Sequence, residues 1–169
     1  MAFCSDHGTH LGDYGFVQKQ TFFEPVARVP FVIAAPGGVT GQIIRTPVSL
    51  GQMVPTFLDM NHIRVASSYT PLSDSIINGL EPSSQPVVSE YTLGSIASWG
   101  IDCPDHLRMV RLGEWKLAWS LDDPSEGLLF NLTTDPEEQK NLYTEAAYTD
   151  VIRGLRDAAG GGYLTAGIV

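Results

Sequence analysis

Two adjacent side chains that could bind a metal ion, Asp6 and His7, follow the short apolar run 2–4 and are followed at once by Gly8. A carboxylate supplies the hard oxygen that Ca²⁺ and Mg²⁺ prefer, whereas an imidazole nitrogen is the more usual ligand of Zn²⁺ or Mn²⁺. Ligands of open α/β sheets lie beyond the carboxyl ends of the strands, where the chain turns into a loop. The pair predicts a divalent-metal site, with a Ser-Asp turn beside a solvent-exposed histidine as the alternative.

Lys19 and His10 are the remaining candidates for chemistry in this segment. A lysine held near a metal can stabilise negative charge on a reacting anion, although a lysine is more often simply exposed at the surface. The spacing of His7, His10 and Asp13 also resembles a small zinc cluster. The glycines of the segment oppose the helix that would align these three residues, which argues against the zinc cluster. We expect His10 near the mouth of the site, as a substrate contact.

These residues lie in a segment that resembles the sulfatase family of the alkaline-phosphatase superfamily. Residues 5–33 read SDHGTHLGDYGFVQKQTFFEPVARVPFVI. The family pattern is Ser-Asp-His/Asn-Gly, then Leu-Gly-Asp/Glu-His-Gly, a lysine, and Glu-Glu-Ala-Ala-Arg-Val-Pro. The resemblance continues in order along nearly the whole chain, through residues 47–59, 89–91, 109–117 and 129–142.

The resemblance implies roles for these residues. It implies that Asp6 and His7 bind one divalent cation, with calcium expected first and manganese or magnesium as alternatives. It also implies that Lys19 is catalytic and contacts the sulfate group of a sulfate ester substrate.

The nucleophile of the family is a formylglycine made from Cys or Ser in a Cys/Ser-x-Pro signature. Neither Cys4 nor Cys103 has a proline two positions later. The chain therefore resembles the C-terminal portion of a sulfatase. We expect it to be inert unless the missing N-terminal part, with its formylglycine, is joined to it or complements it.

Two other functions compete with a portion of a sulfuric ester hydrolase. The first is a portion of a phosphonate or phosphodiester hydrolase on the same scaffold, because phosphoryl and sulfuryl oxygens present similar geometry. The second is a non-catalytic remnant with a structural or binding role. Within any of these functions, we expect loops such as 92–105 to set selectivity for the ligand.

Composition excludes several classes of partner. The chain has 169 residues, 43% hydrophobic and 17% charged, which is enough for a globular core. Its net charge of −9 disfavours nucleic acid and anionic membranes, because both require clustered lysine and arginine. No apolar run approaches the roughly 20 residues that span a bilayer. Since no signal peptide precedes Asp6, the chain as it stands is expected to be cytoplasmic.

The predicted elements give an α/β fold in two parts. Residues 1–92 are expected to form part of an alkaline-phosphatase-like α/β sheet, the C-terminal part of the catalytic domain. Residues 93–169 are expected to form a small antiparallel sheet with a C-terminal helix. Strands are expected at 2–5, 29–35, 86–91, 107–112, 115–121 and 127–132. Helices are expected near 21 and at 49–61 and 146–159, with a short helix or turn at 72–80 and a helical turn at 135–141.

Three local features of these elements can be checked directly. The continuous apolar run 29–35 predicts a strand covered on both faces. Thr21 and Glu24 have the spacing of a capping box, which predicts a helix that begins near Thr21. The helix at 49–61 is expected to bury one apolar face, made of Leu50, Met53, Val54, Phe57 and Leu58.

Overall fold

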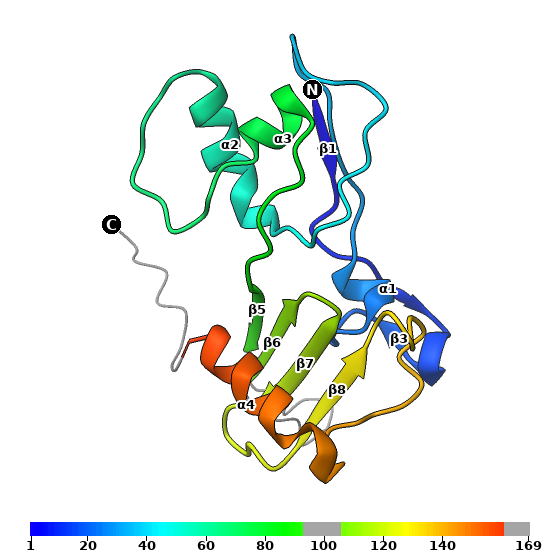
Figure 1. Ribbon diagram of the computed structural model, residues 1–169. Coiled ribbons are helices and arrows are strands. Elements are labelled where there is room, and N and C mark those ends of the chain that lie inside the picture. The colour runs from blue at the N-terminus through cyan, green and yellow to red at the C-terminus, as the bar shows by residue number, and fades with distance from the viewer. Residues whose placement is uncertain (93–105, 161–169) are drawn as a thin grey trace. The chain divides into compact units, whose positions relative to one another are not determined.

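The computed structural model describes residues 1–92 and 106–160, and the chain divides into two compact units, 1–85 and 86–169. Each unit has its own elements (Figure 1). The expected selectivity loop 92–105, apart from its first residue, lies outside the described residues, and so does Cys103. Within the described ranges, the helices are too short or too polar to cross a bilayer.

The first unit contains two small antiparallel ribbons. In one, β1 (Ala2–Cys4) pairs with β4 (Phe31–Ile33), and in the other β2 (His10–Leu11) pairs with β3 (Val17–Gln18). A 3₁₀ turn, η1 (Asp13–Gly15), connects β2 to β3. The first ribbon places residues 2–4 beside residues 31–33, and the second begins at His10. Asp6 and His7 lie on the loop between the two ribbons.

The expected buried strand at 29–35 is shorter and more exposed than predicted. Only Phe31–Ile33 form a strand, and Val32, opposite Phe3 in β1, is 56% exposed. Within the described residues this ribbon has two strands, and the paired side chains of Phe3 and Val32 are both more than half exposed. The apolar run therefore identifies the strand but not the burial of its side chains.

The first helix also begins later than the capping-box pattern predicts. Helix α1 (Glu24–Ala27) has Phe23 as its N-cap and no side-chain cap. The Thr21 hydroxyl instead lies 2.7 Å from Nε2 of His10. That hydroxyl also accepts the backbone N–H of Phe23, which precedes the helix, at 3.4 Å, so it shapes the approach to α1 and does not cap it.

A buried hydroxyl links two helical segments of the first unit. A 3₁₀ turn, η2 (Leu50–Gln52), leads into α2 (Met53–Met60), and α3 (Ser73–Asn78) follows. Thr56, fully buried, donates to the Gln52 carbonyl at 2.6 Å and accepts from the Leu72 backbone N–H at 2.9 Å.

The apolar face predicted for the 49–61 helix is only partly buried. Its residue Val54 is 59% exposed, whereas Pro55 and Thr56 are buried. The 3₁₀ turn at the start explains the change, because it rotates the later residues relative to a continuous α-helix. The start at Ser49 agrees with the prediction: Ser49 and Gln52 form a capping box.

The second unit contains the predicted antiparallel sheet and terminal helix, and the strand at 87–92, which was expected in the first part, joins this sheet as its fourth strand. Strands β5 (Val87–Thr92), β6 (His106–Leu112), β7 (Trp115–Ser120) and β8 (Gly127–Asn131) pair in that order. Helix α4 (Thr149–Ala158) follows a 3₁₀ turn, η4 (Ala146–Tyr148), and packs on the sheet (Figure 1). The buried core is Val110, Leu117, Trp119, Leu129, Leu142, Leu155 and Ala159.

The helical turn expected at 135–141 does not form, and the segment is a non-helical turn and loop. The Asp135 carboxylate accepts the backbone N–H groups of Gln139 at 3.0 Å and Lys140 at 2.9 Å, which stabilises a turn. An aspartate that bonds to nearby backbone N–H groups in this way competes with helix formation. The segment thus forms a capped loop that places Glu138 inside the unit.

Candidate metal and anion site

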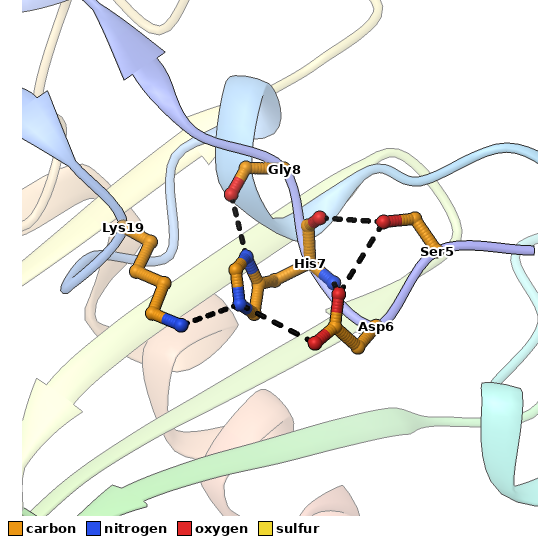
Figure 2. Close-up of polar contacts among 5 residues, drawn as sticks. All are labelled: Ser5, Asp6, His7, Gly8 and Lys19. Atoms are coloured by element: carbon orange, nitrogen blue, oxygen red, sulfur yellow. Dashed lines mark hydrogen bonds and ion pairs between the residues drawn. The ribbon is translucent and has the colours of Figure 1, made fainter.

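The loop after β1 is shaped by hydrogen bonds among its own residues (Figure 2). Ser5 Oγ donates to the His7 carbonyl at 2.8 Å, and the His7 backbone N–H donates to Asp6 Oδ1 at 2.9 Å. This N–H is the main reason that the pKa of Asp6 lies below its ordinary value of 3.8. The Asp6 carboxylate is therefore held in its charged form, with the side chain 84% exposed and free to bind a cation.

Gly8 fixes the loop against the first helix. Its backbone N–H donates to the Val26 carbonyl at 2.8 Å. A Cβ at this position would lie 1.9 Å from the Pro25 carbonyl oxygen, a distance that no side chain tolerates. Only glycine therefore allows this close approach, and the approach positions the two residues that precede it.

The tautomer of His7 follows from its partners. Nδ1 lies 2.8 Å from the Gly8 carbonyl oxygen, which can only accept, so Nδ1 carries the proton. In the neutral ring, Nε2 then carries the lone pair, which can accept a hydrogen bond or bind a metal ion. Metal-binding histidines characteristically donate their other ring N–H to a carbonyl or carboxylate in this way.

Two groups meet at the Nε2 atom of His7. The Lys19 ammonium lies 2.7 Å from it, and Asp6 Oδ2 lies 3.4 Å from it. The three residues predicted from the sequence are thus brought together, as Figure 2 shows. Lys19 follows the β2–β3 ribbon, and Gln18 before it has a positive φ of 74°, which turns the chain as it leaves the ribbon.

His10 occupies a different place from the one expected. It is 2% exposed and packs among Tyr14, Phe16 and Phe23, with ring centroids 5.6–6.1 Å away. A histidine so enclosed does not lie at the mouth of a site, so this part of the prediction is corrected. Its role as a substrate contact stays a prediction. The possible zinc cluster does not form either: no group of three potential ligands occurs among the described residues.

Ser5 and Gly8 contribute to the site although the sequence did not identify them as site residues. Ser5 shapes the turn, and Gly8 orients the His7 ring and anchors the loop. The serine before Asp6 and the glycine after His7 were visible in the sequence. Ser5 acts through its neighbours Asp6 and His7, whereas the role of Gly8 depends on its close approach to the backbone of residues 25 and 26, which no local pattern reveals.

The donor atoms fit two positions in the coordination shell of a divalent cation. Oxygen ligands of Ca²⁺ lie at about 2.3–2.6 Å, so neighbouring ligands are separated by about 3.2–3.7 Å. The separation of Asp6 Oδ2 from His7 Nε2, 3.4 Å, lies within that range. An imidazole nitrogen is less typical of calcium than of manganese or zinc, so the donor set itself does not favour calcium over manganese.

Comparisons with known proteins match most of the chain. A family model described as "N-sulphoglucosamine sulphohydrolase, C-terminal" matches residues 12–159. The choline-sulfatase of Rhizobium meliloti is 38% identical over 147 residues, which cover 84% of this chain and 26% of that protein. The chain therefore spans about a quarter of the length of this relative.

Solved structures agree on the fold. A protein determined in complex with its substrate D-glucosamine-2-N,6-O-disulfate has a TM-score of 0.78 at 22% identity, covering 94% of this chain and 32% of that one. The phosphonate monoester hydrolase of Agrobacterium radiobacter has a TM-score of 0.76 at 26% identity, covering 90% and 32%. The chain thus belongs to the sulfatase family and corresponds to the C-terminal region of its members.

Proposed function

We propose that this chain is the portion of a sulfuric ester hydrolase that supplies half of a divalent-metal site and a lysine for the sulfate group. The observation that supports this most directly is the meeting of three predicted groups at one atom. Asp6 Oδ2 and Lys19 Nζ both approach His7 Nε2, which carries the lone pair of the ring because Nδ1 donates to the Gly8 carbonyl.

Each of these groups has a distinct part in the proposed chemistry. A bound divalent cation would neutralise the anionic substrate and lower the pKa of the attacking group. Asp6 and His7 would hold that cation, and the Gly8 carbonyl would keep the His7 ring in the orientation that ligation requires. The Lys19 ammonium would stabilise the charge that grows on the non-bridging or leaving oxygen of the sulfate.

The remaining ligands and the formylglycine nucleophile belong, in this proposal, to the N-terminal part of such an enzyme. Ca²⁺ takes 6–8 oxygen ligands, and Asp6 and His7 supply only two donors. We therefore expect the 169 residues to bind metal weakly. We propose that the first unit, with the β1–β4 ribbon, completes a larger alkaline-phosphatase-like sheet in the intact protein, where the exposed face of Val32 is covered.

Thermal unfolding with and without Ca²⁺ or Mn²⁺ tests the metal site. A site with a millimolar Kd stabilises the fold by about 1 kcal/mol at about 5 mM metal, which raises the Tm by about 2–4 °C. Asp6→Ala should abolish this shift. Asp13→Ala, which removes an exposed carboxylate from the same segment, should leave it unchanged. A Tm that does not change with either metal would contradict the proposal and favour a non-catalytic remnant with a structural or binding role.

A phosphonate or phosphodiester hydrolase is the second candidate. The observation in its favour is the fold shared with the Agrobacterium radiobacter phosphonate monoester hydrolase, at 26% identity. The two candidates differ in the anion that Lys19 contacts. We would follow the NMR signals of Lys19 in the metal-loaded chain during titration with sulfate and with methylphosphonate. A stronger response to methylphosphonate would favour the second candidate.

A further inference from the structure

The lone pair of His7 Nε2 accepts a hydrogen bond from the ammonium group of Lys19 in this structure. The Gly8 carbonyl takes the proton on Nδ1, so Nε2 has a single lone pair and no hydrogen. The 2.7 Å separation from Lys19 Nζ is that of a short, charge-assisted hydrogen bond, in which the ammonium donates. Asp6 Oδ2, 3.4 Å from the same nitrogen, makes this position favourable for a cation.

A metal ion bound by His7 needs that same lone pair. One lone pair cannot both accept a hydrogen bond from an ammonium and form a coordinate bond to a metal. The ammonium and the metal also repel each other at such short range. Lys19 must therefore leave Nε2 whenever a metal binds there.

The backbone around Lys19 explains why it reaches His7. Gln18 pairs with His10 in the β2–β3 ribbon and has a φ of 74°, and Thr9 Oγ1 donates to its carbonyl at 3.1 Å. The ribbon therefore fixes the chain up to residue 18 and releases the exposed side chain of Lys19 just beyond it. A long, flexible side chain that starts at a fixed point can move between two positions without a change in the backbone.

We propose that Lys19 is a stand-in cation, which occupies the metal position on His7 in the metal-free protein and is released to the anion position when metal binds. This inference rests on the metal site proposed above. Metal binding would then prepare the site for an anion in two ways, because it adds the cation itself and frees a second positive charge. Without metal, Lys19 is held on His7 and is a poorer ligand for sulfate.

Calorimetric titration of Ca²⁺ and Mn²⁺ into the wild type and Lys19→Met tests the competition. Removal of the stand-in should tighten metal binding about tenfold, the effect of one charge-assisted hydrogen bond at a partly exposed site. Loss of any nearby positive charge also favours cation binding, so Arg28→Met, which removes an exposed cation from the same unit, is the control. Through-solvent effects fade at about 1 M salt, where the Debye length is about 3 Å, whereas direct competition persists.

NMR supplies a second, independent measurement. In the metal-free protein, Lys19→Met should shift the Nε2 signal of His7. In the wild type, titration with Ca²⁺ should move the Lys19 and His7 signals with one midpoint. Two results would overturn this inference but leave the proposed metal site standing. One is that Lys19→Met binds metal with the wild-type affinity. The other is that the Lys19 signal of the wild type does not move when metal binds. If neither protein binds Ca²⁺ or Mn²⁺, the proposed metal site is wrong and the inference falls with it.

Discussion

Lys116 and Glu138 form an ion pair inside the second unit, with Nζ and Oε1 2.9 Å apart and side chains 3% and 0% exposed. Lys116 lies on β7, opposite Phe130 of β8, and Glu138 has a positive φ of 49°. The loop after β8 thus places a carboxylate against a strand lysine that is more than twenty positions earlier in the chain. The pair links that loop to the sheet.

Glu138→Gln should destabilise the protein by about 3–5 kcal/mol, because it leaves the buried lysine charge without compensation. Urea unfolding followed by circular dichroism measures this change. The matched control is Glu145→Gln, since Glu145 and Lys140 are also 2.9 Å apart but are 41% and 70% exposed. That control should cost less than about 1 kcal/mol. Equal effects of the two substitutions would show that burial does not govern the strength of the pair.

Gly8→Ala should distort the loop that carries Asp6 and His7. The added Cβ would lie 1.9 Å from the Pro25 carbonyl oxygen, so the backbone must move and the bond from Gly8 N–H to Val26 is lost. We expect a destabilisation of about 1–3 kcal/mol, typical of forced overpacking. We also expect loss of the Tm shift with metal. A variant of unchanged stability that still responds to metal would contradict the role assigned to Gly8.

Gly154→Ala should have the opposite effect on stability. Gly154 lies inside α4 and is exposed, and a Cβ there meets nothing within 4 Å. Alanine in the middle of a helix is favoured over glycine by about 0.5–1 kcal/mol. The midpoint of urea unfolding should rise accordingly. A lower midpoint would mean that α4 requires a glycine for a reason other than helix propensity.

The local parts of the fold could be predicted from the sequence, and the parts that depend on distant contacts could not. The hairpin that joins the predicted strands 107–112 and 115–121, and the helical start at Ser49, depend on neighbouring residues. The pair of Lys116 with Glu138, by contrast, depends on how a loop returns to the sheet. Residue identity alone gave no reason to expect Lys116, rather than another lysine, to form a buried ion pair.

The candidate site shows the same division. Asp6, His7 and Lys19 were identified from residue type and spacing, with the family resemblance, and the structure brings them together. The tautomer of His7 depends on a carbonyl whose direction the sequence does not specify. The burial of His10 depends on three aromatic side chains that only the folded ribbon gathers around it.

Glu81 should make the stability of the first unit depend on acid pH. Its carboxylate accepts the backbone N–H groups of Arg45 and Thr46 and the Thr46 hydroxyl. The Arg45 backbone N–H is the main reason that the pKa of Glu81 lies below its ordinary value of 4.5. A lowered pKa in the folded state means that this stabilisation is present above pH 4.5 and is lost as the pH falls through the folded-state value.

The measurement is the urea midpoint of the wild type and Glu81→Gln between neutral pH and pH 3. The wild type should be the more stable near neutrality, and the difference should shrink as Glu81 becomes protonated below about pH 4.5. Glu126→Gln, an exposed glutamate of the second unit, should follow the wild-type pH profile. A constant difference across the range would show that the charge of Glu81 does not stabilise the unit.

The 169-residue chain should not hydrolyse an aryl sulfate. Asp6, His7 and Lys19 can bind metal and stabilise charge, but none of them is the nucleophile that the family uses. Cys4 lacks the family's Cys-x-Pro signature, and its thiol lies 3.9 Å from Met53 Sδ rather than among the site residues. Release of 4-nitrophenol from 4-nitrophenyl sulfate, with saturating Ca²⁺ or Mn²⁺, should equal the rate in buffer.

Lys19→Met separates true turnover from contamination in that assay. If the purified chain does release product, and Lys19→Met or Asp6→Ala reduces the rate, then these residues act on substrate without the family's nucleophile. That result would overturn the expectation of an inert portion. If the rate is the same in both variants, the product comes from a contaminating sulfatase. The expected baseline in all three proteins would mean that bond cleavage needs a group which these 169 residues do not supply.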